Sequence, residues 1–132
     1  MIYIKNFLDW FTLKPKLDNQ LVKPPQFSEG QVWWCFCGEN IGVEVSGKGK
    51  DYLRPFLIFT KLDKFSFVAI PLSTKIKVGS WYFQIKFKNI DQIIMLNQIK
   101  FFDYRRLNYK YGEITKQEHE SVKKAIRLLL KI

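Results

Sequence analysis

The fold of this chain is decided by residues 38–74, which read GENIGVEVSGKGKDYLRPFLIFTKLDKFSFVAIPLST. A loop rich in glycine and lysine leads to Arg54, and two apolar runs follow at 56–59 and 65–70. Runs of this kind, separated by turn-forming residues, are typical of neighbouring antiparallel strands. Arg54 would then begin one strand where Ser73 and Thr74 end the next. These side chains are therefore expected to meet at one end of a small sheet, where a phosphate could be held.

Outward from this stretch, the sequence predicts a mainly β fold. β-branched and aromatic residues cluster in five runs, with glycine, asparagine and aspartate between them. The predicted strands are 31–37, 53–59, 65–70, 81–87 and 93–96. Short antiparallel strands at this spacing favour a small barrel, which leaves few exposed edges.

Helices are predicted at both ends of the chain. Residues 3–13 have helical spacing of apolar residues, and Pro15 is expected to end that helix. The apolar stripe consists of Ile4, Phe7, Leu8 and Phe11. Residues 1–28 are therefore read as a helical extension of a domain that covers 29–132. In the last helix, Thr115 and Glu118 have capping-box spacing, and the apolar stripe comprises Val122, Ala125, Ile126 and Leu129.

Charge and composition favour a polyanionic partner. The chain has 22 basic and 12 acidic residues, a net charge of +10, and 17% aromatic residues among its 132. Aromatic side chains beside lysine and arginine suit single-stranded nucleic acid, because bases stack and phosphates pair. In the alternative reading, the aromatics fill the core and the charge only aids solubility. At 47% hydrophobic residues, the chain can bury a core without disulfides or metals.

The two cysteines indicate a reducing compartment. Cys35 and Cys37 lie two apart in a predicted strand, so both point to one face. We expect two buried thiols rather than a disulfide. The N-terminal stretch lacks the pattern of a signal peptide, and no apolar run approaches the roughly 20 residues of a membrane span. A cytoplasmic protein with no membrane association is therefore expected.

Few residues offer catalytic chemistry. His119 is the single histidine and is expected on the solvent face of the last helix. The acidic residues lack the spacing of metal ligands, so no metal or other cofactor is expected. Taken singly, Arg54 is read as a surface residue at the start of a strand, or as a guanidinium able to fork onto a phosphate. Ser73 and Thr74 are likewise either turn residues or phosphate donors.

Together, these stretches resemble the MazF/PemK family of toxin endoribonucleases. The resemblance covers about residues 30–130 and is carried by 38–59, 68–74 and 95–114. Its motifs are a Gly-x-Glu loop, an Arg-Pro that opens a strand, a Pro-x-Thr strand end, and a Gln-Ile-Arg segment followed by Arg-Leu. In this chain they read Gly42-Val43-Glu44, Arg54-Pro55, Pro71-Leu72-Ser73 and 98–107.

The resemblance implies an SH3-like barrel, usually a symmetric dimer, that cleaves single-stranded RNA without a metal ion. In that reaction the 2′-hydroxyl attacks the adjacent phosphate and leaves a 2′,3′-cyclic phosphate and a 5′-hydroxyl. Arg54 matches the catalytic arginine of the family, and Ser73 matches its catalytic threonine. The residues expected to contact RNA are Glu44, Lys48, Lys50, Thr74, Lys75, Asn97, Gln98 and Lys100.

Three departures from the family pattern bear on activity. Ser73 keeps the hydroxyl of a threonine but loses its rotamer restraint. Asn97 stands where members often carry a carboxylate, and Lys100 replaces a forked arginine with a point charge.

The resemblance also implies an antitoxin partner. A toxin with a charge of +10 should attract an acidic, partly disordered antitoxin segment that folds on binding. Two alternatives remain open. One is a toxin of the same fold that inhibits a protein such as DNA gyrase, and the other is an inactive relative that binds only RNA or antitoxin.

Overall fold

The computed structural model describes residues 5–132. The elements are α1 Phe7–Asp18, β1 Gln31–Phe36, β2 Leu53–Asp63, β3 Ser66–Ser73, β4 Tyr82–Phe87, β5 Ile90–Met95, β6 Lys100–Asp103, β7 Leu107–Glu113 and α2 Lys116–Leu130. Two short 3-10 turns, Leu96–Gln98 and Tyr104–Arg106, flank β6.

The strands form one antiparallel sheet in the order β4-β5-β3-β2-β1-β7, and β6 also pairs with β3. β3 pairs with β6 through Ser66–Ala69 and with β5 through Leu72 and Ser73, so the sheet branches at this strand. The predicted mainly β class is confirmed. The sheet curls around its core like a barrel, but no pairing within residues 5–132 joins β6 or β4 to β7.

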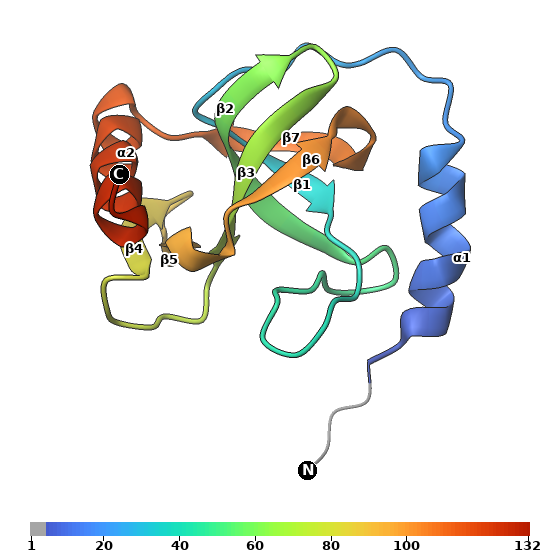
Figure 1. Ribbon diagram of the computed structural model, residues 1–132, viewed down its shortest axis with the longest axis horizontal. Coiled ribbons are helices and arrows are strands. Elements are labelled where there is room, and N and C mark those ends of the chain that lie inside the picture. The colour runs from blue at the N-terminus through green and yellow to red at the C-terminus, as the bar shows by residue number, and fades with distance from the viewer. Residues whose placement is uncertain (1–4) are drawn as a thin grey trace.

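Alternation along the strands fills a core on each face of the sheet. Phe56 and Ile58 of β2 point into one cluster, and Leu57 between them points into the other. α2 covers the second cluster with Val122 and Ile126. Figure 1 shows α1 and α2 on opposite sides of the sheet, so the strands lie between the two helices.

The five predicted strands are confirmed, although β6 and β7 were missed. β7 alternates weakly, since its residues are exposed or only partly buried. β5 begins at Ile90 rather than at residue 93, because Lys88 and Asn89 both adopt positive φ (54° and 61°). Two positive φ values in a two-residue loop make the tight hairpin turn that matches strand twist.

The prediction for α1 was wrong in its end and in its buried face. Pro15 lies inside the helix, which continues to Asp18. A proline removes one intrahelical hydrogen bond, but buried Trp10 and Leu17 anchor the helix on both sides of it. Phe7, Leu8 and Phe11 of the predicted stripe are exposed instead, and Ile4 lies outside the described residues.

His119 also differs from its predicted surface position. It is 8% exposed, because α2 begins against the middle of β2. Its Nε2 donates to the carbonyl oxygen of Phe59 at 3.0 Å, and its ring lies parallel to the Phe59 ring at 5.6 Å. The predicted capping box is confirmed, since Thr115 and Glu118 exchange hydrogen bonds at the start of this helix.

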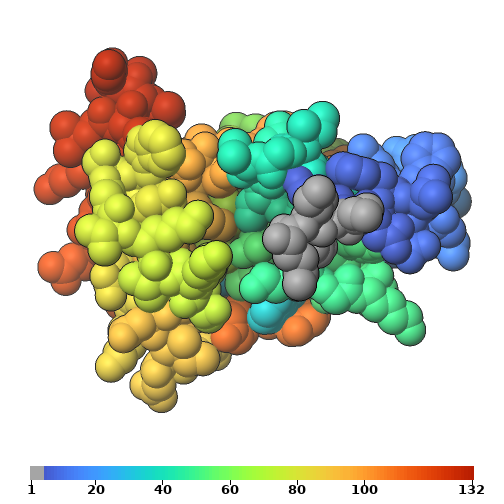
Figure 2. All heavy atoms as spheres, turned by 90° about the horizontal axis from the view of Figure 1, so that it is seen from below, coloured from blue at the N-terminus to red at the C-terminus, as the bar shows by residue number. Residues whose placement is uncertain are grey.

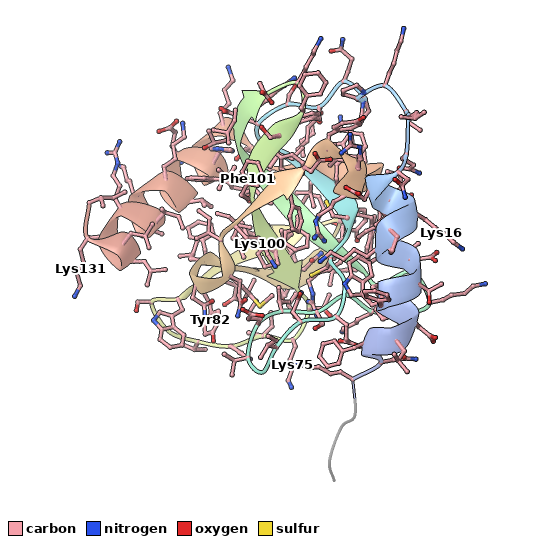
Figure 3. All side chains as sticks on the ribbon, turned by 45° about the vertical axis from the view of Figure 1, so that its right-hand side comes forward. Lys16, Lys75, Tyr82, Lys100, Phe101 and Lys131 are labelled. Atoms are coloured by element: carbon pink, nitrogen blue, oxygen red, sulfur yellow. The ribbon has the colours of Figure 1, made fainter. Side chains whose placement is uncertain are left out.

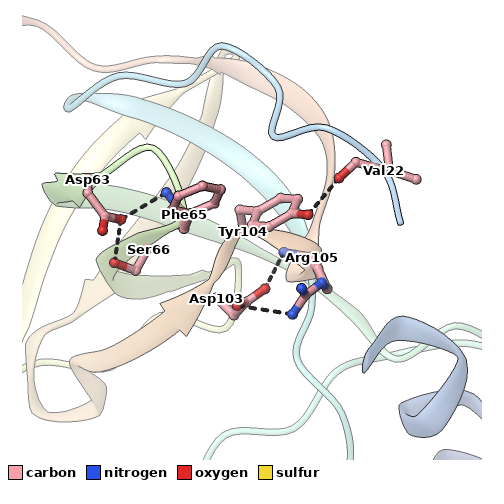
Figure 4. Close-up of polar contacts among 7 residues, drawn as sticks. All are labelled: Val22, Asp63, Phe65, Ser66, Asp103, Tyr104 and Arg105. Carbon is pink, nitrogen blue, oxygen red and sulfur yellow. Dashed lines mark hydrogen bonds and ion pairs between the residues drawn. The ribbon is translucent and has the colours of Figure 1, made fainter. Parts of the chain in front are cut away.

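Short polar contacts fix the turns around β6 (Figure 4). Asp63 accepts hydrogen bonds from the Phe65 amide and the Ser66 hydroxyl, both at 2.8 Å. The hydroxyl of Tyr104 donates to the Val22 carbonyl oxygen at 2.6 Å, which ties the segment after α1 to the sheet. No helix in the described part of the chain is long and apolar enough to cross a membrane.

Candidate nucleic-acid interface

Arg54 and Ser73 lie side by side at one end of the β2–β3 pair. Phe56 pairs with Pro71 across these two strands. Arg54 lies two residues before Phe56, and Ser73 lies two residues after Pro71, so both extend past the same end of the pairing. Nη1 of Arg54 donates to the carbonyl oxygen of Leu72, which precedes Ser73, at 3.3 Å. Both residues line the same two grooves, so the expected convergence of Arg54 and Ser73 at one end of the sheet is present in the structure.

The Arg54 guanidinium is held in place but not neutralised. Its Nε donates to the Ser46 carbonyl oxygen at 2.8 Å. Among the described residues, no carboxylate lies within 4.0 Å of it. Burial lowers the pKa of Arg54 from its ordinary value, and the nearby Cys37 opposes that shift. A guanidinium remains charged at neutral pH, so a half-buried positive charge is left without a counterion.

Within the described part of the chain, the Ser73 hydroxyl donates no hydrogen bond. Its Oγ accepts a hydrogen bond from the Lys75 amide at 3.1 Å, and a hydroxyl that accepts still has one O–H donor. Thr74 follows on the exposed side of the strand end.

Two grooves meet at this pair of residues. The first has a volume of about 370 Å³ and the second about 350 Å³. Both are lined by Lys48, Arg54 and Ser73, and within residues 5–132 neither is lined by an acidic residue, a histidine or a cysteine. Seen from below, the 38–52 loop lies between α1 and residues 74–81 (Figure 2). The arrangement suits a chain of phosphates that crosses at Arg54.

The second groove has the most positive lining. Lys75, Lys77 and Asn97 line it beyond the shared residues. Figure 3 shows Lys75 and Tyr82 at the lower end of the sheet, whereas Lys16 and Lys131 lie on the helices at opposite sides.

Glu44 and Gln98 shape the loop over this groove. The Gln98 side chain accepts from the Val45 amide at 3.1 Å and donates to the Val43 carbonyl oxygen at 2.9 Å. Glu44 accepts from the Ile41 amide at 3.0 Å, within the same loop. Both side chains therefore already bond to backbone, although both had been predicted to contact RNA.

Two predicted lysines lie away from both grooves. Lys50 lines a separate hollow next to Asn6 and Asp9 of the N-terminal segment. Lys100 starts β6 opposite Ala69, and its Nζ lies 5.6 Å from the centre of the Phe102 ring.

Sequence reasoning missed several groove residues. The first groove has an aromatic wall and a buried amide, supplied by Trp34, Tyr109, Tyr111 and Gln92. The second has Lys77 and Tyr82. Lys77 follows Lys75 at the alternating spacing and could have been found from the sequence. The aromatic wall depends on the pairing of β1 with β7, and β7 itself had not been predicted.

No three His, Cys, Asp or Glu side chains of residues 5–132 are grouped as a metal site would require. The two grooves therefore offer cations, hydroxyls and aromatic rings as their means of binding. A small antiparallel sheet with an unneutralised arginine in a cationic groove is typical of a protein that binds a polyanion.

The family is shown by comparison with known sequences. Residues 28–130 match the family described as PemK-like, MazF-like toxin of type II toxin-antitoxin system, and the chain belongs to this family. A search of curated proteins finds no significant sequence match.

Solved structures show that this fold is shared with known toxins. A MazF from Deinococcus radiodurans superposes with a TM-score of 0.64 at 15% identity, covering 80% of this chain and 97% of that one. An endoribonuclease in complex with its cognate antitoxin, from a Mycobacterial species, gives 0.61 at 17% identity, covering 81% and 97%. A MazE–MazF structure from Deinococcus radiodurans gives 0.57 at 13% identity, covering 80% and 96%. At these identities the likeness concerns the fold.

Proposed function

We propose that this toxin is an endoribonuclease that cuts single-stranded RNA, chiefly mRNA, without a metal ion. The observation that carries the proposal is the half-buried Arg54 guanidinium, which lines the same grooves as Ser73 and has no carboxylate partner within residues 5–132. A buried charge without a counterion is unfavourable unless a ligand supplies one. A phosphodiester is a suitable anion for a groove lined by lysines.

The proposed reaction is a transesterification within the RNA. The 2′-oxygen forms a bond to phosphorus, and the bond from phosphorus to the 5′-oxygen breaks. The 2′-hydroxyl loses its proton and the departing 5′-oxygen gains one, which leaves a 2′,3′-cyclic phosphate and a 5′-hydroxyl. Arg54 stabilises the extra charge on the phosphorane, and Ser73 donates to a phosphate oxygen or orients the 2′-hydroxyl. A preorganised donor of this kind contributes about 3 kcal/mol to barrier lowering.

The lining of the grooves supports catalysis mainly by charge stabilisation. Among the described residues, no carboxylate or imidazole lines either groove, so water is proposed to take the proton of the 2′-hydroxyl and to supply the proton of the 5′-oxygen, while Arg54 stays charged. Lys48, Lys75 and Lys77 are proposed to contact phosphates on either side of the cut. Thr74 and Asn97 supply polar contacts there, and Lys50 and Lys100 act only from a distance. Glu44 and Gln98 hold the loop.

The partners follow from the same chemistry. The toxin is proposed to act in the cytoplasm as a homodimer, and an acidic antitoxin segment would cover the cationic groove and silence it. Residues 1–28 are proposed to be an extension of a toxin domain that spans 29–132.

The proposal is tested by incubating the chain with a long single-stranded transcript in EDTA. Discrete fragments that end in a cyclic phosphate would support it. Intact RNA that is bound would identify an inactive binder, and RNA that is neither cut nor bound would favour a toxin that acts on a protein such as DNA gyrase. Arg54→Ala serves as the inactive variant. Arg127→Ala, which removes one positive charge from the exposed face of α2, is the matched control.

A further inference from the structure

One wall of the first groove is built from aromatic rings. Trp34 of β1 faces Tyr109 of β7, and their rings stack with centroids 6.2 Å apart at an angle of 30°. Tyr111, two residues further along β7, lies 5.3 Å from Trp34. Tyr109 is 51% exposed. Half-open aromatic faces of this kind are where unpaired bases stack in single-stranded nucleic acid complexes.

The groove also contains a buried amide with an unused acceptor. Gln92 is 1% exposed, and its Nε2 donates to the Phe87 carbonyl oxygen at 3.2 Å. Within residues 5–132 its Oε1 makes no hydrogen bond, and this atom is not closed off, since the one buried side-chain N or O atom without a partner there is Nε of Arg105. An amide oxygen has two acceptor lone pairs, and Gln92 lines the groove, so this oxygen is suited to accept an N–H from the edge of a bound ring.

The aromatic groove is continuous with the proposed reaction site. Lys48, Arg54 and Ser73 line both grooves. An RNA strand whose scissile phosphate lies at Arg54 therefore has one neighbouring nucleotide beside the lysines of the second groove. Its other neighbour lies beside Trp34 and Gln92.

We propose that the first groove is a base-reading subsite. It holds the nucleobase adjacent to the scissile phosphate, which stacks on Trp34 and Tyr109 and donates an edge N–H to Gln92 Oε1. This inference rests on the proposed function and adds to it the residues that select the cleavage sequence.

Binding is measured first, with a mixed-sequence single-stranded DNA that lacks the attacking 2′-hydroxyl and is bound without being cut. Trp34→Ala is expected to raise the dissociation constant by about 5- to 150-fold, the usual effect of losing one stacked base. Trp34→Phe, which keeps a ring, should stay close to wild type. Trp81→Ala is the matched control, because Trp81 is 53% exposed and lines neither groove.

Cut-site mapping on a defined transcript then tests Gln92. Gln92→Met keeps the packing volume but removes the acceptor, and it should relax the base preference at one position next to the cut. An abasic nucleotide at that position should slow wild-type cleavage but leave Trp34→Ala unaffected.

The outcomes separate this inference from the proposed function. If the wild-type chain cleaves RNA but Trp34→Ala binds nucleic acid as tightly as wild type, the subsite is overturned and the proposed nuclease activity is retained. If binding depends on Trp34 but no RNA is cleaved, the proposed nuclease activity is overturned and the base-binding groove is retained. A Trp34→Ala variant that sediments as a monomer where wild type is a dimer, and whose binding recovers at high protein concentration, would show that this wall joins two copies of the chain. That result also overturns the subsite.

Discussion

Among the described residues, the hydrogen-bond partners of the Arg54 guanidinium are backbone carbonyl oxygens. The oxygens of Ser46 and Leu72 fix the direction of the guanidinium, but they supply partial charge only. Removing it therefore takes away two hydrogen bonds and, at the same time, a half-buried charge. For folding, the loss of two hydrogen bonds is destabilising and the removal of a half-buried charge is stabilising, so the two effects oppose each other. For catalysis, the loss of the guanidinium has no such compensation.

Arg54→Ala is accordingly expected to lower the cleavage rate by about 100- to 1,000-fold, the effect of losing one preorganised donor. The melting temperature should stay nearly unchanged. Initial rates on a mapped transcript and a thermal melt check both values. Retained cleavage, or a fall in melting temperature as large as that of a core deletion, would show that Arg54 has a structural role.

The two thiols are sequestered. Cys35 and Cys37 are 0% and 1% exposed and both belong to the core cluster. Burial raises the pKa of both thiols, with a further contribution at Cys35 from the proximity of Cys37. Because the folded-state pKa is raised, the fold favours the neutral thiol. This contribution to stability is complete below the ordinary thiol pKa and is lost as the pH rises above it.

We therefore expect Cys35 and Cys37 to resist iodoacetamide at pH 8 in the folded protein and to react fully in denaturant, since the thiolate is the reactive form. Mass spectrometry of the labelled protein measures this. Rapid labelling of either cysteine without denaturant would contradict the burial.

At the scale of elements, α1 supports the loop that carries Arg54's partner. Trp10 is 6% exposed and meets the Tyr52 ring edge-on at 5.6 Å. It also fills the space beside Gly38, where a Cβ would lie 2.4 Å from the indole. The loop that starts at Gly38 continues to Ser46, whose carbonyl oxygen binds Arg54. Docking of the helix is thus connected to the position of the guanidinium.

Trp10→Ala should lower the free energy of unfolding by about 3–5 kcal/mol, as expected for a buried aromatic residue, and should also slow cleavage by loosening the loop. Urea unfolding and initial rates test this. Phe11→Ala is the matched control, because Phe11 is 72% exposed on the same helix and should change stability by less than about 0.5 kcal/mol. Equal effects of the two substitutions would contradict the docking of α1 through Trp10.

At the scale of the whole molecule, the chain has a net charge of +10. Within the described residues, lysine and arginine line the two grooves and no acidic residue does. The three ion pairs among the described residues involve Asp103, Glu113 and Glu120, none of which lines either groove. A cleft lined by one sign of charge focuses the field and attracts polyanions.

Binding to single-stranded nucleic acid should therefore weaken with salt. Four cations line the second groove, Lys48, Arg54, Lys75 and Lys77, which predicts a slope of about −3 for log K against log salt concentration. Lys75→Ala should reduce the magnitude of that slope by about 0.7. Lys131→Ala, on the far helix in Figure 3, should leave it unchanged. The slope is measured from titrations between about 50 and 200 mM salt, and an identical slope for both variants would argue against a localised site.

Many features of this protein can be predicted from short stretches of its sequence. The first five strands, the capped C-terminal helix, the buried thiols and the meeting of Arg54 with Ser73 follow from short-range periodicity, because β2 and β3 are consecutive strands and their register brings the two residues together. Such features depend on neighbours in the chain and can be read without knowing the rest of the fold.

Other features were decided only by the tertiary structure. Pro15 stays within α1 because Trp10 and Leu17, on either side of it, pack in a buried cluster with Tyr52. His119 is buried because α2 packs on β2. The aromatic wall combines Trp34 with Tyr109 through the pairing of two strands that are distant in sequence. In each case, burial against a segment distant in sequence outweighs local propensity. The free energy of such a contact cannot be predicted from the neighbouring residues in the chain.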